Sequence, residues 1–169
     1  LISPGMFKAF LSPCYRHVTD LLRRNGIDVV IVDCDGDIAK LVPLWLEAGV
    51  NTMFPLQIRN GTDVFALRRQ YGKDLLLCGG VDKTRLIGGK AAIDAEIERI
   101  APLVAMGGYI PHLDHLVPPD ITLDNFEYYL KIKRQAMGIS QGARPNPLTA
   151  MKASAVQPRD FIRTDEAGD

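Results

Sequence analysis

Short apolar runs alternate with helical stretches along most of this chain. Four runs each end in a polar or glycine-rich cluster, and apolar residues at helical spacing follow each cluster. The predicted strands comprise residues 27–32, 51–57, 74–78 and 108–110. Because repeated strand–helix units form parallel sheets, and such proteins carry their chemistry at the carboxyl ends of the strands, the pattern predicts an α/β fold with its functional residues in those four clusters.

Helical spacing and terminal signals predict five helices. The first has Ser3 as its N-cap, is interrupted or kinked at Pro13, and ends at Asn25-Gly26. The others span residues 38–48, 63–71, 90–106 and 122–137. In the helix over residues 90–106, one face is apolar and the charged residues, Glu96 among them, fall mostly on the others.

Four such units make up half of an eight-unit TIM barrel, and a half barrel has two open sheet edges. A complete small open sheet with helices on both faces fits the spacing as well. The near-continuous aliphatic run of residues 27–32 is typical of a parallel strand covered on both faces. We expect a half-barrel domain over residues 1–137 and a flexible tail over residues 138–169, where Gly, Pro, Ser and charged residues replace the periodic pattern.

Composition narrows the class of protein. Of the 169 residues, 47% are hydrophobic, and the 20 basic residues balance the 20 acidic ones, so a nucleic-acid partner is not expected. No apolar run approaches the length of a membrane span, and no signal peptide is recognisable. The 3 cysteines indicate a reducing, cytoplasmic setting. The chain begins with Leu1, and its first residues read like the middle of a protein, so we expect a truncated chain.

The first cluster, Asp33-Cys34-Asp35-Gly36-Asp37, places three carboxylates around one thiol. These groups would repel each other unless a cation, a donor or a bound ligand compensates, and both thiolate and carboxylate bind metals. The cluster therefore indicates a metal or substrate site. The structural alternative is a strand-to-helix turn in which Gly36 supplies an unusual backbone angle and Asp37 caps the helix at Ile38.

The last cluster, His112-Leu113-Asp114-His115, holds two of the 3 histidines of the chain. Histidine beside aspartate serves as a general acid or base, or as a metal ligand. Strict alternation would place His112 and Asp114 on one face, although alternation is often lost at a strand end. The structural alternative is a loop in which these side chains cap backbone groups. The remaining histidine, His17, is expected on the surface of the first helix.

Two further clusters give weaker indications. Gly79-Gly80 would let a ligand approach the backbone closely, or would form a tight turn in which Asp82 caps the next helix. Gln57 and Arg59 follow the second strand, where Arg59 is suited to hold a carboxylate or to face solvent.

Several of these stretches, in this order, resemble the C-terminal half of the uroporphyrinogen decarboxylase superfamily over about residues 1–137. They comprise residues 1–7, 32–37, 46–51, 79–83 and 107–115, with Pro118-Pro119. The superfamily includes cofactor-free decarboxylases of haem synthesis and zinc-dependent methyltransferases that pass methyl groups between corrinoid proteins and thiols. The resemblance implies a TIM barrel of which this chain forms the last four βα units.

The resemblance to the decarboxylases implies decarboxylation of a tetrapyrrole-linked substrate without a cofactor. In them the last strand usually ends in Gly-Tyr-Ile-Phe-Asn-Leu-Gly-His-Gly; here His115 matches the histidine, and His112, Asp114 and Leu116 replace the asparagine and two glycines. Asp33, Asp35 and His115 are then the candidate catalytic residues. The candidate substrate-binding residues are Gln57, Gly79, Gly80, Asp82, His112 and Asp114.

The resemblance to the methyltransferases implies zinc and a corrinoid protein partner. Their first cluster is typically His-x-Cys-Gly; Cys34 matches the cysteine, and Val32 stands where the histidine would be. A zinc site here would use Cys34 with Asp33, His112 or His115. Expected partners are a small-molecule substrate and the N-terminal half barrel, or a second copy in a homodimer. A hypothesis of another class is an inactive fragment or binding module that pairs through its open sheet edges.

Overall fold

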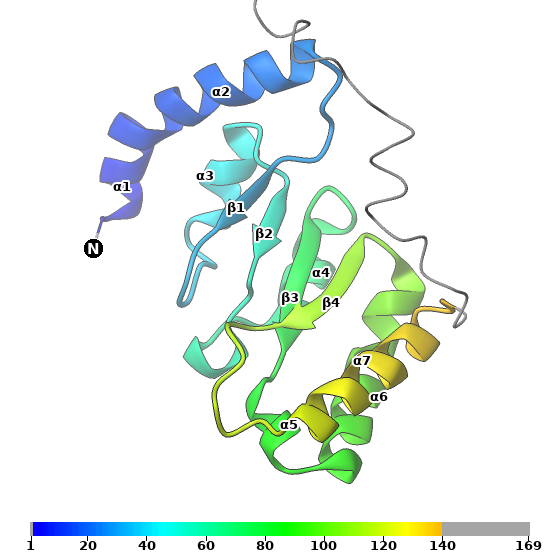
Figure 1. Ribbon diagram of the computed structural model, residues 1–169. Coiled ribbons are helices and arrows are strands. Elements are labelled where there is room, and N and C mark those ends of the chain that lie inside the picture. The colour runs from blue at the N-terminus through cyan, green and yellow to red at the C-terminus, as the bar shows by residue number, and fades with distance from the viewer. Residues whose placement is uncertain (1, 140–169) are drawn as a thin grey trace, which may run out of the picture. The chain divides into compact units, whose positions relative to one another are not determined.

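Four parallel strands form a single sheet in the order in which they occur along the chain. The structure, a computed structural model, describes residues 2–139. The strands are adjacent in the order β1-β2-β3-β4 (Figure 1). They span β1 (Ile31–Asp33), β2 (Thr52–Phe54), β3 (Leu76–Val81) and β4 (Tyr109–Leu113). Sequential, parallel neighbours joined through helices are the arrangement of a half barrel, as predicted. The predicted tail, apart from its first two residues, lies outside the described residues.

Local signals fix most helix ends. The helical elements are α1 (Pro4–Met6), the π-helix η1 (Phe7–Leu11), α2 (Ser12–Arg24), α3 (Val42–Glu47), the 3-10 helix η2 (Ile58–Asn60), α4 (Val64–Tyr71), α5 (Thr84–Ile87), α6 (Lys90–Met106) and α7 (Leu123–Ala136). As predicted, Ser3 is an N-cap, and its hydroxyl accepts from the backbone N–H of Met6. The Thr122 hydroxyl caps α7, which begins where the predicted helix over residues 122–137 does. Pro13 does not break the first helix, because it falls in the first turn of α2, directly after the π-helical turn.

Helices cover one face of the sheet. The in-register row Val32, Met53, Leu77 and Tyr109 is buried on this face. Helices α3 and α4 lie behind the sheet in the view of Figure 1, and α6 lies beside β4, behind α7. Together these side chains and the apolar stripe of α6 form the main hydrophobic core. None of the helices among residues 2–139 is long and apolar enough to cross a lipid bilayer.

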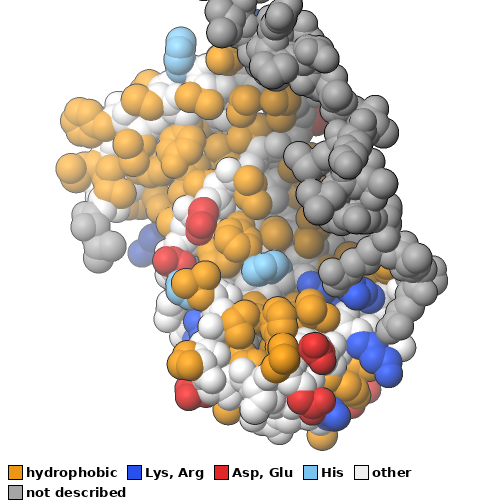
Figure 2. Space-filling view, viewed as in Figure 1, with side chains coloured by type: hydrophobic (Ala, Val, Ile, Leu, Met, Phe, Trp, Pro, Cys, Tyr) orange, Lys and Arg blue, Asp and Glu red, His pale blue; other side chains and the backbone are white. Residues whose placement is uncertain are grey.

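The opposite face is open at β1 and β4 among the described residues, which corrects the expectation of a first strand covered on both faces. Ile31 of β1 is 54% exposed and Ile110 of β4 is 59% exposed. Strand β1 is also shorter than predicted, because residues 27–30 do not pair as a strand. Figure 2 shows apolar side chains gathered on this face of the molecule. The aliphatic run of residues 27–32 therefore indicated a strand correctly, but it did not indicate that helices cover both faces of that strand.

Strand β3 runs through Gly79 and Gly80 to Val81, although a loop was expected there. The reason is a close backbone approach. A Cβ added to Gly79 would lie 1.8 Å from the Pro55 carbonyl oxygen, and one added to Gly80 would lie 2.7 Å from a methyl carbon of Val64. The glycines therefore allow the segment after β2 and the start of α4 to pack against β3. The expectation that they approach a substrate is not supported, because both residues are buried in packing contacts.

Helix α6 forms over the predicted residues, but Glu96 was placed on the wrong side of it. Glu96 is 4% exposed. Its carboxylate accepts a hydrogen bond from the backbone N–H of Asp82 and binds the guanidinium of Arg99 through both oxygens. Burial of this acid is tolerated because each of its oxygens has a donor.

Candidate active site

The carboxyl ends of the strands open into a cavity of about 480 Å³. Its polar lining comes from Asp33, the last residue of β1, and Asp35 in the loop that follows, and from His112 within β4 and His115 after it. Lys133 of α7 adds a cation. The remaining lining is largely apolar and comprises Phe54, Pro55, Leu113, Leu116, Val117, Phe126, Tyr129 and Leu130. Figure 2 shows acidic and histidine side chains among the apolar ones on this side of the molecule. Four residues, Asp33, Cys34, His112 and His115, were expected to converge on one rim of the sheet; Asp33, His112 and His115 line this cavity, and Cys34 does not.

Asp35 and His115 form the central contact of the site. His115 Nε2 lies 3.8 Å from Asp35 Oδ1. The same carboxylate oxygen accepts a hydrogen bond of 2.7 Å from the Gln57 side-chain amide. Imidazole and carboxylate groups are the side chains that most often accept and donate protons in enzymes, so the pair is suited to transfer a proton beside the cavity that both residues line.

Gln57 lies outside the cavity and holds the loop that carries Asp35. The side chain is 8% exposed and does not line the cavity. Its amide nitrogen donates to Asp35, and its amide oxygen accepts from the backbone N–H of Gly36 and from the Asn60 side chain. Contact with a substrate was expected at Gln57, but these bonds occupy it, and its observed role is to hold the loop after β1 in place.

His112 lies on the open face of β4, within the strand. Its Nδ1 is 2.8 Å from the Leu113 carbonyl oxygen, and its ring meets the Phe54 ring edge-on at a centroid distance of 5.3 Å. Because a carbonyl oxygen only accepts hydrogen bonds, Nδ1 donates to it, and in the neutral ring Nε2 is then an acceptor. His112 is thus suited to accept a proton or a hydrogen bond from a ligand.

Asp114 is turned away from the cavity, so the alternation that would pair it with His112 is lost. It is 2% exposed. Its carboxylate accepts from the backbone N–H groups of Lys83 and Ile58. Burial raises the pKa of Asp114, while the hydrogen bond from Lys83 and its ammonium act in the opposite direction. The expectation that Asp114 binds substrate is wrong for this conformation, because the side chain is enclosed by backbone.

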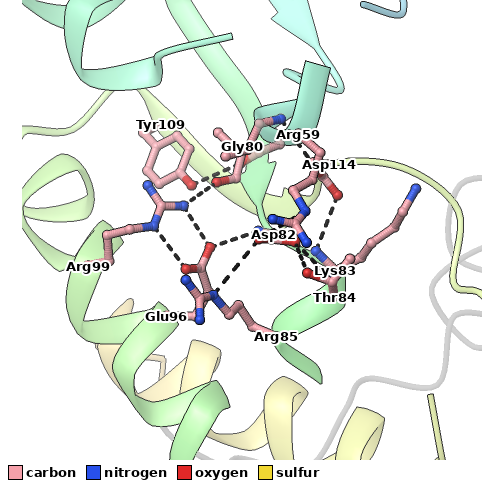
Figure 3. Close-up of polar contacts among 12 residues, drawn as sticks. Arg59, Gly80, Asp82, Lys83, Thr84, Arg85, Glu96, Arg99, Tyr109 and Asp114 are labelled. Carbon is pink, nitrogen blue, oxygen red and sulfur yellow. Dashed lines mark hydrogen bonds and ion pairs between the residues drawn. The ribbon is translucent and has the colours of Figure 1, made fainter. Parts of the chain in front are cut away.

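Asp82 is likewise buried, so it does not present its carboxylate to a ligand. It accepts from the backbone N–H and hydroxyl of Thr84, and the guanidinium groups of Arg59 and Arg85 each lie 3.9 Å from it (Figure 3). Arg99 donates to the Gly80 carbonyl. This network fixes the loop after β3. Arg59, which was considered for a substrate carboxylate, points to Asp82 instead.

Cys34 does not line the cavity. Its thiol lies 3.6 Å from the Asp35 carbonyl oxygen. Burial, followed by the charges of Asp35 and Asp33, raises the pKa of the Cys34 thiol, which disfavours the thiolate that binds metals. Across residues 2–139, no group of three or more His, Cys, Asp or Glu side chains is arranged to hold a metal ion. The predicted zinc ligand set is thus not brought together by these residues.

Helix α7 contributes a wall of the cavity that the sequence did not indicate. Phe126, Tyr129, Leu130 and Lys133 line it. The Lys133 ammonium lies 5.1 Å from the centroid of the Tyr129 ring, and burial lowers the pKa of Lys133. The spacing of these residues predicted a helix with an apolar face, but nothing in the spacing revealed which side of the sheet that face would meet.

Comparison with known proteins assigns the chain to a family. The family model described as "Uroporphyrinogen decarboxylase (URO-D)" matches residues 1–135. A curated relative, the uroporphyrinogen decarboxylase of Maricaulis maris (strain MCS10), is 27% identical over 116 residues. That match covers 68% of this chain and 33% of the relative, so the chain spans about a third of the length of the protein it matches.

Proposed function

The chain belongs to the uroporphyrinogen decarboxylase family, and on that premise we propose that its cavity takes part in removing carboxyl groups from a carboxylated pyrrole, without a cofactor. The observation that carries the proposal is the Asp35–His115 pair, which lies at the mouth of a largely apolar cavity. A pair suited to proton transfer, next to apolar walls, fits a reaction in which a proton is added and a charged carboxylate leaves as neutral CO₂.

In the proposed reaction, a ring carbon of the pyrrole is protonated and the ring becomes cationic. The carboxylates of Asp33 and Asp35 stabilise this cation at the rim. The bond between the side-chain carbon and its carboxylate then breaks, its electron pair returns to the ring, and CO₂ leaves. A proton then adds to the side-chain carbon and the ring carbon gives up the proton it took on, so the neutral pyrrole is restored and the net change is replacement of CO₂ by hydrogen. His115, when protonated, contacts a substrate carboxylate.

The apolar lining favours the bond-breaking step. A carboxylate is strongly hydrated in water and loses that hydration between side chains such as Phe54, Phe126 and Leu130, whereas the developing CO₂ has little hydration to lose. The Lys133 ammonium on the same wall offers a counter-charge for a second carboxylate of the ligand.

The remaining units of the family barrel are the proposed partner in the active form. Among residues 2–139, β1 and β4 each pair with one neighbouring strand, so each has an open edge. Further parallel strands would pair with these edges and cover the open face. A second copy of the chain is the alternative partner, and the mass of the particle in solution distinguishes the two.

The test is consumption of uroporphyrinogen under anaerobic conditions by the chain, alone and mixed with the first half of the Maricaulis maris enzyme. We expect uroporphyrinogen to lose carboxyl groups in the mixture, and mass spectrometry of the products measures this loss. Asp35→Asn and His115→Gln should each lower the rate about 100-fold or more.

Asp37→Asn is the matched control, because Asp37 belongs to the same loop but, among residues 2–139, accepts only from the backbone N–H of Ala39 and does not line the cavity. Its rate should equal that of the unaltered chain. Turnover that survives both Asp35→Asn and His115→Gln, or a mixture that leaves uroporphyrinogen intact, would refute the proposal.

A further inference from the structure

We propose that Asp114 is a positioning residue that holds Asp35 and His115 together at the mouth of the cavity. The inference rests on the proposed function, which makes this pair the reactive one. Asp114 itself lies outside the cavity lining and touches neither member of the pair through its side chain. It acts through the loops that carry them.

The first step of the argument is that one carboxylate joins three strand ends. Asp114 follows β4, and its backbone N–H donates to the Val81 carbonyl at the end of β3. Its Oδ1 accepts from the backbone N–H of Lys83, at 3.2 Å, in the loop after β3 (Figure 3). Its Oδ2 accepts from the backbone N–H of Ile58, at 3.3 Å, in the loop after β2.

The second step is that these contacts connect Asp114 to both members of the reactive pair. Ile58 directly follows Gln57, and Gln57 holds both the Asp35 carboxylate and the backbone N–H of Gly36. Asp35 contacts His115, and His115 directly follows Asp114. Asp114 therefore fixes both ends of the Asp35–His115 contact: one through the adjacent peptide bond and the other through Gln57.

The third step is that the position calls for a carboxylate. Two separate backbone N–H groups point at Asp114, and each of its two oxygens accepts from one of them. An asparagine offers only one acceptor oxygen, and its NH₂ group would face the second N–H.

The test uses an isotope-labelled chain and NMR signals that report the pair itself. In Asp114→Asn, exchange of the Gln57 side-chain amide with solvent should rise about tenfold, because the loop that holds Gln57 opens more often. The His115 ring signals should move toward those of His17, which is exposed. Asp94→Asn is the control: it removes a charge that accepts from Tyr128 between α6 and α7, and it should leave both signals unchanged.

The outcomes separate a positioning role from others. If the Ile58 and Lys83 amides shift but the signals of Gln57 and His115 do not, Asp114 acts only locally and the inference is wrong. If Asp114→Asn does not fold, Asp114→Gly takes its place. The backbone N–H of Leu77, which donates to the Gly108 carbonyl between β3 and β4, reports whether the sheet itself is intact. Loss of its protection from exchange in both variants would show a purely structural role and overturn the inference. Because these signals do not require turnover, an inactive chain that shows them contradicts the proposed function and leaves the positioning role intact.

Discussion

The two faces of the sheet differ in how completely other residues of the chain bury their apolar side chains. On the covered face, apolar side chains are buried against α3, α4 and α6, and the one deeply buried acid of α6 has a donor on each oxygen. On the open face, Ile31 and Ile110 stay exposed although they sit in strands. Stability thus resides mainly on the covered face, while the open face and the cavity at its end are available for other molecules.

The largest effect is expected from a substitution on the covered face, at the contact between β3 and the segment after β2. Gly79→Ala should destabilise the chain by at least about 4 kcal/mol or prevent folding, because its Cβ would collide with backbone rather than with a flexible side chain. Urea unfolding followed by circular dichroism measures this.

Gly26→Ala is its matched control. Gly26 also has a positive φ, of 76°, but nothing lies within 4 Å of an added Cβ. Its cost should be only about 1 kcal/mol. Equal effects of the two substitutions would show that backbone conformation, and not close packing, is what Gly79 supplies.

Two phenylalanines of the π-helix η1 allow a second comparison between a buried and an exposed side chain. Phe7 is 2% exposed and packs on Tyr15 and Trp45, whereas Phe10 is 67% exposed. Phe7→Ala should cost about 3 kcal/mol or more, and Phe10→Ala less than about 0.5 kcal/mol. The measurement is again urea unfolding of the two variants. A large loss on removal of Phe10 would mean that its face is already covered in solution, for example by a second copy.

The smallest expected effect is a pH dependence that arises from Asp114. Its pKa in the folded chain is raised from 3.8, chiefly by burial. The stability that this group contributes is therefore fully present below its unfolded pKa and is lost as the pH rises through its folded pKa. We expect the unfolding free energy of the unaltered chain, relative to Asp114→Asn, to be larger near about pH 3 than near about pH 7. The opposite trend would mean that the two backbone N–H groups outweigh burial.

Predictions from the sequence succeeded where the signal was local. The period of apolar residues located α6, and Ser3, Asp63 and Thr122 mark the helix starts at which their side chains are observed as caps. These features depend only on side chains within one turn of each other. The same approach failed at Gly79, because a glycine within a strand is explained only by what packs against it.

For the candidate site, the clusters at the strand ends were predicted and their division of labour was not. The sequence predicted that Asp33, Asp35, His112 and His115 lie at the same edge of the sheet, and all four line the cavity. It gave no sign that Gln57 and Asp114 turn away from the cavity to hold the loops. Lys133 was not predicted either, since a lysine in an amphipathic helix is ordinarily solvated.

The sequence by itself determined the order of strands and helices, the parallel sheet that follows from that order, and the end of the sheet at which polar residues collect. These follow from periodicity and chain connectivity, which are written along one dimension. Tertiary structure alone decided which side chains line the cavity and which support it, because contacts such as that between Gln57 and Asp35 join residues far apart in the chain. Such contacts depend on how neighbouring strand ends align, and no local pattern records that alignment.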